Sequence, residues 1–134
     1  MLKQLSIYAE NEKGTLEKIT GALVDASINI WGSVVSDNAE YGVIRMIVSD
    51  PELAVLKIKE GGYICRLTNV IGVEVADEVG NLNKLLRNLQ EMNINIDYIY
   101  LSFNRESSLP VMIFHTEDVM EVEEGLRMRG FSVL

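Results

Sequence analysis

Residues 26–32 read ASINIWG and residues 92–98 read MNINIDY, so the triplet Ile-Asn-Ile recurs at an offset of 66 residues (94 − 28). Further identities share this register without a gap: Gly14/Gly80, Leu16/Leu82, Lys18/Lys84, Ser36/Ser102, Asn38/Asn104 and Glu40/Glu106. Conservative apolar pairs such as Leu5/Ile71 lie between them. Because glycines, asparagines and apolar positions coincide in one register, we interpret the chain as one unit written twice.

Each half repeats the same order of predicted elements. Alternating apolar residues predict a first strand at residues 3–9 and again at 70–76. A turn with a glycine follows, and two strands joined by a short loop come later, at 29–36 and 43–49 and at 95–103 and 110–116. A helix is predicted between the first strand and this strand pair in each half, from apolar residues at helical spacing. These residues are Leu16, Ile19, Leu23 and Ala26 in the first half and Leu82, Leu85, Leu89 and Met92 in the second.

A second helix and a last strand complete each half. Asp50 suits the N-cap of one helix, with Pro51 at its first position, and Thr116 is the expected cap of the other. Gly62 and Gly130 suit left-handed stops, and final strands are expected at 63–69 and 131–134. The predicted fold class is α+β, with two tandem ferredoxin-like βαββαβ units at 1–68 and 69–134. Each unit has an antiparallel sheet with its helices on one face.

The predicted hairpin strands are apolar on both faces. Ile96, Tyr98 and Tyr100 alternate with Ile99, Leu101 and Phe103, and Ile30 and Val34 alternate with Trp31 and Val35. A sheet with helices on one side only usually has a polar second face. We therefore expect another sheet to cover that face through homodimerisation, with Trp31 in the interface.

Composition and charge exclude several function classes. The formal net charge is −8, and the 12 Lys and Arg residues form no cluster, which argues against nucleic acid and membranes as partners. The single cysteine, Cys65, excludes an intrachain disulfide and a Cys-based zinc site, and it favours a cytoplasmic location. No apolar run approaches the length of about 18 residues that a transmembrane helix needs.

No catalytic motif is recognisable in the sequence. A nucleophile elbow, a P-loop and a dinucleotide fingerprint are all absent. His115 is the single histidine and lies in a predicted strand, which favours a structural or surface role over that of a general base. We predict that the protein is not an enzyme and that it holds no cofactor or metal.

The loops before the first helix of each half are the most distinctive stretches, AENEKGTL (9–16) and ADEVGNL (76–82). Gly14 and Gly80 permit unusual backbone angles and close approach of a ligand. The helix start beyond them offers unpaired N–H groups to a carboxylate, and nearby acids could receive an ammonium group. From physics alone, two interpretations remain open: an α-amino-acid site, or a turn that only reverses the chain.

The two segments LSIYAENEKGTLEKITGALVDASINIWG and IGVEVADEVGNLNKLLRNLQEMNINIDY resemble the ACT family of regulatory amino-acid-binding domains, in tandem. The family pattern is a strand, then Asn-x-x-Gly-x-Leu, a helix, and a small residue before Ile-Asn-Ile. Stand-alone tandem members similar to this chain include acetolactate synthase regulatory-like proteins. This chain departs from the pattern at Lys13 and Val79, where the family often has Pro.

The resemblance implies that a free amino acid binds between paired units, where the loop and helix start of one unit meet the second strand of its neighbour. The implied ligand-binding residues are Asn11, Glu12, Lys13, Gly14, Thr15, Leu16, Asn29, Ile30, Asp77, Glu78, Val79, Gly80, Asn81, Leu82, Asn95 and Ile96. For Asn29 and Asn95, a structural turn role is the alternative to ligand contact. For the whole protein, the alternative is a ligand-free interaction module or a regulatory subunit of an enzyme of amino-acid metabolism.

Overall fold

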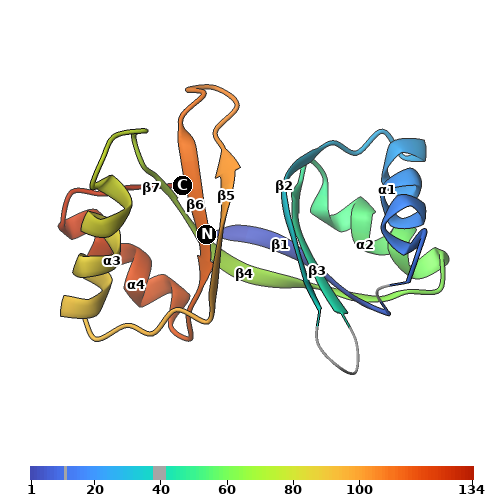
Figure 1. Cartoon of the computed structure of the whole chain (residues 1–134), viewed down its shortest axis with the longest axis horizontal. Coiled ribbons are helices and arrows are strands. Elements are labelled where there is room, and N and C mark those ends of the chain that lie inside the picture. The colour runs from blue at the N-terminus through green and yellow to red at the C-terminus, as the bar shows by residue number, and fades with distance from the viewer. Residues whose placement is uncertain (11, 38–41) are drawn as a thin grey trace. The chain divides into compact units, whose positions relative to one another are not determined.

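The computed structural model describes residues 1–10, 12–37 and 42–134, and these form two compact units. One unit comprises Lys3–Thr68, and the other comprises Asn69–Leu134 together with Met1–Leu2. The expected α+β class with two βαββαβ units is confirmed. In each unit, both helices lie on one side of that unit's strands (Figure 1).

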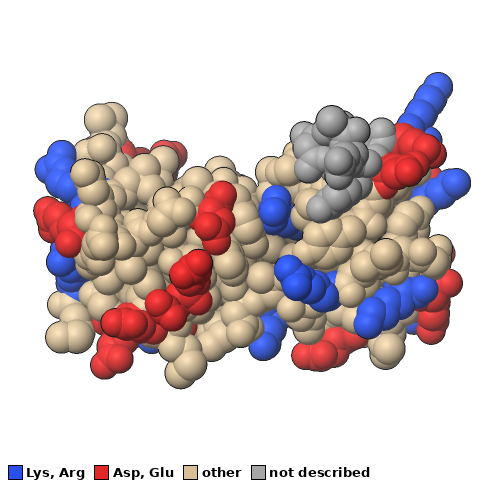
Figure 2. Space-filling model, turned by 90° about the horizontal axis from the view of Figure 1, so that it is seen from below, with Lys and Arg blue, Asp and Glu red and all other residues tan. Residues whose placement is uncertain are grey.

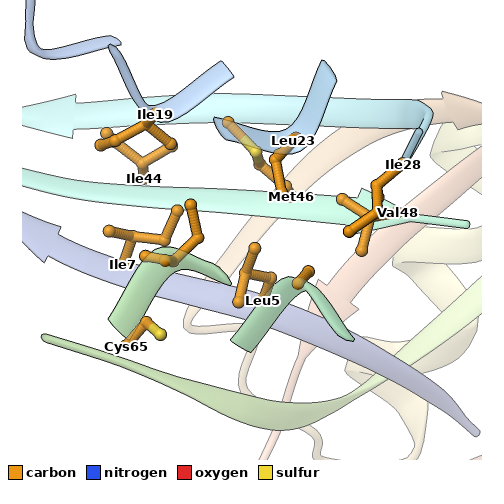
Figure 3. Packing of buried hydrophobic residues seen from close by; sticks show 11 residues of the cluster. Leu5, Ile7, Ile19, Leu23, Ile28, Ile44, Met46, Val48 and Cys65 are labelled. Carbon is orange, nitrogen blue, oxygen red and sulfur yellow. The ribbon is translucent and has the colours of Figure 1, made fainter. Parts of the chain in front are cut away.

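The unit Lys3–Thr68 contains strands β1 (Leu2–Ala9), β2 (Ile30–Asp37) and β3 (Gly42–Val48) and helices α1 (Thr15–Asp25) and α2 (Pro51–Glu60). Its strand order is β2-β3-β1-β4, where β4 spans Ile64–Glu74. Leu5 and Ile7 lie opposite Met46 and Ile44 on the face that the helices cover. Figure 3 shows these side chains packed with Ile19 and Leu23 of α1 in one buried cluster.

The unit that follows repeats this arrangement with β4, α3 (Asn81–Glu91), β5 (Tyr98–Phe103), β6 (Pro110–His115), α4 (Val119–Met128) and β7 (Ser132–Val133). Its strand order is β5-β6-β4-β7. The core joins Ile71, Val73 and Phe114 of the sheet to Leu85 and Leu89 of α3 and to residues of α4. β4 is therefore the last strand of one unit and the first strand of the next, without a turn between them.

The expected helix signals are mostly confirmed. The side chain of Asp50 accepts a hydrogen bond from the N–H of Leu53 at 3.2 Å, and Pro51 begins α2. Gly62 and Gly130 take left-handed φ angles of +89° and +87°. The expected cap Thr116 is wrong, because Thr116 is buried next to the end of β6.

Asp118 instead occupies the N-cap position, and α4 begins at Val119.

The duplication also extends to the backbone. Ser27 and Asn93 both take positive φ angles, of +57° and +59°. The offset of 66 holds as far as the ends of β2 and β5, and then increases to 68 (119 − 51) at the starts of α2 and α4. The hairpin between β5 and β6 is therefore two residues longer than its counterpart, where residues 38–41, including Asn38 and Glu40, lie outside the described part of the chain.

Two expectations about strand faces are wrong. Ile30 lies opposite Val48 and Gly32 opposite Ile47, so Trp31 is the extra residue of a bulge, and Ile30 and Val34 point to opposite faces. Ile96 precedes β5 and packs against the helix-covered core, so it does not share a face with Tyr100. Tyr100 is buried in the single chain, and sheet-on-sheet homodimerisation stays a prediction.

We expect Leu23→Ala to lower the free energy of unfolding by about 2–5 kcal/mol, because Leu23 is fully buried and its truncation leaves a cavity. The neighbouring Val24→Ala is the matched control, since Val24 lies on the same helix and is 71% exposed. Urea unfolding followed by circular dichroism measures both. Equal losses for the two variants would contradict the packing described above.

Candidate functional site

The loops before α1 and α3 make the same backbone turn. Gly14 has φ +89° and ψ −8°, and Gly80 has φ +91° and ψ −11°. These left-handed angles are unfavourable for residues with a side chain, which explains glycine at both positions. Each glycine is the N-cap of the helix that follows it.

The hydrogen bonds of the two turns also correspond. The N–H of Thr15 donates to the carbonyl oxygen of Glu12 at 3.1 Å, and the N–H of Asn81 donates to that of Glu78 at 3.3 Å. The second loop has an additional bond, from Nδ2 of Asn81 to the carbonyl oxygen of Ala76 at 3.0 Å. Asn81 therefore stiffens the second loop in a way that sequence reasoning did not reveal.

Open space adjoins both loop glycines. A Cβ atom added to Gly14 or Gly80 would meet no neighbouring heavy atom within 4 Å. Leu16 and Leu82 begin the apolar stripes of the two helices but are 43% and 42% exposed, because burial on each helix begins one turn later. Val79 is fully exposed in the second loop. Apolar surface and an uncovered helix start thus lie side by side in each loop.

The electrostatics of the loops suit a small zwitterion. Neither α1 nor α3 has a side-chain cap bond, so the glycines leave the first-turn N–H groups without a side-chain acceptor. The positive end of each helix dipole favours an anion at this position. The expected site residues Glu12, Lys13, Asp77 and Glu78 are exposed nearby in the chain, while Asn11 lies outside the described residues.

The expected strand-start residues lie at the other end of each helix. The N–H of Asn29 donates to Oγ of Ser49 at 2.9 Å, and the carbonyl oxygen of Asn29 accepts from the N–H of Ser49 at 2.9 Å. Asn95 and Ile96 line a shallow hollow of about 400 Å³ beside the second half of α3, with Leu86, Leu89, Gln90, Asn93 and Ile94. Asn29 therefore has a structural role in its turn, and Asn95 borders accessible space.

The structure does not bring the two halves of the expected site together within one unit. An 11-residue helix separates Gly80 from Asn95, as it separates Gly14 from Asn29. At 1.5 Å per residue such a helix is about 16 Å long. A pocket that uses both halves therefore requires a loop from one unit and a strand start from another.

Other polar groups in the described chain form no comparable site. Nδ1 of His115 lies 2.6 Å from Oδ2 of Asp97, and its ring stacks on Tyr98. Burial raises the pKa of the Cys65 thiol, an effect that nearby Lys59 partly offsets. Within the described residues, no group of three or more His, Cys, Asp and Glu is placed to hold a metal ion.

A groove of about 600 Å³ in the first unit is lined by Tyr8, Ala9, Glu10, Ile64 and Arg66. The guanidinium carbon of Arg66 lies 5.7 Å from the centre of the Tyr8 ring. Sequence reasoning missed this pair, because the two residues lie on strands far apart in the chain.

On the face drawn in Figure 2, acidic and basic side chains are both present. Among the described helices, none has the length and apolar character needed to cross a membrane.

Comparison with known proteins places the chain in a family. The profile of the ACT domain pair matches residues 1–131. The crystal structure of protein BT0572 from Bacteroides thetaiotaomicron is 29% identical with a TM-score of 0.89, over 99% of this chain and 91% of that one. The regulatory subunit of aspartate kinase from Thermus thermophilus, in its ligand-free form, is 13% identical with a TM-score of 0.66, over 94% and 91%. No curated protein matches the chain in sequence.

The chain belongs to the ACT domain pair family, since the family profile spans nearly its whole length. The resemblance seen in the sequence is thereby confirmed. ACT domain pairs are regulatory modules of amino-acid sensing. The aspartate kinase subunit shares the fold with this chain, and that is all that its similarity shows.

We expect Gly80→Ala to lower the free energy of unfolding by about 1–2 kcal/mol, because φ at this position is +91° and alanine is strained there. Gly80→Asn is the matched comparison and should cost less, since asparagine tolerates the left-handed region. A Cβ atom at this position would meet no neighbouring heavy atom within 4 Å, so the cost of alanine comes from backbone strain. Urea unfolding that shows no loss for Gly80→Ala would refute the left-handed turn.

Proposed function

We propose that this protein is a non-catalytic regulator that senses a free amino acid. The ligand binds where the loop and helix start of one ACT unit, at Gly14 or Gly80, meet the strand start of another unit, at Asn29–Ile30 or Asn95–Ile96. The observation that carries the proposal is the repeated glycine-capped turn with open space beside it. It occurs twice in a member of a family of amino-acid-sensing regulatory modules.

Each part of an α-amino acid has a counterpart at these loops. The carboxylate accepts hydrogen bonds from the first-turn N–H groups of α1 or α3 and lies at the positive end of the helix dipole. The ammonium group lies near the carboxylates of Asp77 and Glu78, or of Glu12 in the first loop. The ligand side chain contacts Leu16 in one loop, or Val79 and Leu82 in the other, which are all exposed.

Binding regulates by population shift. An amino acid held between two units stabilises the arrangement in which they meet, and only that arrangement carries the complete site. The change in the arrangement of the units is transmitted to a metabolic enzyme that docks on the same module. The lone buried Cys65 fits the reducing cytoplasm as the place of action.

A second candidate function is a ligand-free interaction module or regulatory subunit. The exposed apolar residues Ile99, Leu101 and Phe103 on β5 favour it, because such a strip is unusual on a surface without a partner. The two candidates differ in one measurable property, since only the sensor changes its stability when an amino acid is added.

Thermal shift and calorimetry of the whole chain against the amino acids, one at a time, test the proposal. We expect at least one amino acid to stabilise the protein, by about 2.7 kcal/mol when its concentration is 100 times its dissociation constant. Flat responses to every amino acid would rule out the sensor and leave the interaction module.

The four left-handed glycines provide matched variants for locating the site. Gly14→Trp and Gly80→Trp fill the open space at the helix starts and should abolish the response to ligand. Gly62→Trp and Gly130→Trp have nearly the same φ and the same free space at helix ends, so they carry equal backbone strain away from the site. They should retain binding, and loss of binding in all four variants would refute the proposed location.

A further inference from the structure

The first two residues of the chain belong to the second unit. Met1 and Leu2 group with Asn69–Leu134, although the strand β1 that they begin continues in the other unit. The α-ammonium group of Met1 donates a hydrogen bond to the carbonyl oxygen of Leu134 at 3.1 Å. The N–H of Leu134 donates in turn to the carbonyl oxygen of Gly72 on β4 at 2.9 Å. The two ends marked in Figure 1 are thus joined to each other and to β4.

The helix α4 places a carboxylate in the interior of the same unit. The side chain of Glu123 is 5% exposed, and its neighbours Val122 and Leu126 belong to the core cluster. Among the described residues, Oε2 of Glu123 is a buried side-chain oxygen that accepts no hydrogen bond. Because a buried carboxylate is costly without compensation, this one depends on a nearby cation.

The cation closest to this carboxylate is the α-ammonium group of Met1. Its nitrogen lies 2.8 Å from Oε2 of Glu123. The pair does not meet the geometry of a hydrogen bond, but the attraction between the two charges depends on their separation and remains. Arg127 is a weaker partner, since its Nη2 lies 3.9 Å from the same oxygen and its side chain is 53% exposed.

Gly72 provides room for the next side chain, that of Leu2. A Cβ atom at Gly72 would lie 2.6 Å from Cδ1 of Leu2, which is too close for both atoms to stay in place. Gly72 is not one of the described glycines with a positive φ angle, so its backbone conformation does not require glycine. Space for Leu2 therefore explains the missing side chain.

The first unit has neither of these features at the matching positions. The offset of 66 pairs Gly72 with Ser6, whose Oγ lies 2.9 Å from Oγ1 of Thr68. The offset of 68 between α2 and α4 pairs Glu123 with Val55, which packs against the apolar core of its unit. The buried acid and the glycine notch thus occur together in the one unit that contains the chain's first residues.

We propose that Glu123, Gly72 and Leu134 form a recognition site for the chain's own free amino terminus. The ligand is an α-ammonium group followed by a branched apolar side chain. An acylated or extended terminus has no positive charge at Met1 and leaves the carboxylate of Glu123 buried without its counter-ion. The stability of the second unit therefore depends on the chemical state of the amino terminus. The site needs no free amino acid, so it stands or falls independently of the sensor.

Acetylation of the whole chain tests the recognition of the ammonium group. Acetic anhydride at about pH 6.5 reacts with the α-amine in preference to lysine, whose amine holds its proton to a much higher pH. Mass spectrometry confirms that Met1 is present and carries one acetyl group. Hydrogen exchange of the proteolytic fragments then reports on each unit separately. We expect the amides of α4 and β7 to exchange about tenfold faster after acetylation, while those of α1 are unchanged.

Two glutamine variants show whether Glu123 is the partner. Glu123→Gln removes the buried charge at nearly constant shape, so acetylation should then change exchange by less than about twofold. Glu124→Gln is the matched control, since Glu124 is the exposed neighbour on α4, and it should keep the full effect of acetylation. Equal acceleration in Glu123→Gln and the native chain, or none in the native chain, would overturn the proposal.

Paired alanine variants test the notch for Leu2. Gly72→Ala should speed the exchange of β4 and β7 amides in the native chain, because its Cβ displaces Leu2. In a Leu2→Ala background the same change should have a smaller effect, since Cδ1 of Leu2 is then absent. Equal effects of Gly72→Ala in the two backgrounds would exclude Gly72 from the site.

Discussion

The left-handed turn at Gly14 and Gly80 is the constraint on which the rest of each unit depends. It ends a strand and starts a helix at a set angle, so that Ile19 and Leu23, or Leu85 and Leu89, fall on the sheet. A residue with a side chain would strain this turn, and a capping side chain would occupy the helix start. Because glycine has no side chain, the first-turn N–H groups of the helix are left without a side-chain acceptor. A structural role and a binding role for these residues are compatible, because one geometry serves both.

Local rules predicted most of the fold from the sequence. Alternation and helical spacing found the strands and helices because each pattern is written within one element, and Asp50 with Pro51 marked a helix start. The bulge at Trp31 could not be predicted from the sequence. The stretch NIWGSVV has apolar residues at both odd and even positions, so no break in the alternation is visible. Thr116 and Asp118 both suit a cap, and burial of Thr116 after β6 decided between them.

The candidate site was predictable only in part, for a related reason. The glycine turns are local, so the sequence was sufficient to place them. The exposure of Leu16 and Leu82 was not predictable, because helical spacing shows which side of a helix is apolar and not where the sheet beneath it ends. The separation of Gly80 from Asn95 follows from the helix between them. Which unit would supply the strand start beside the Gly80 loop depends on how units assemble. A single chain's periodicity carries no information on that point.

The edge strands β2 and β5 occupy the same position in the two repeats and differ in regularity. Two identical units present two identical open edges, and a chain with two such edges can add copies without end. The edge strand β2 has a bulge at Trp31, whereas β5 pairs with β6 over six residues without a shift in register. Divergence between the repeats has thus left two edge strands that differ in regularity, although both descend from the same position of one unit.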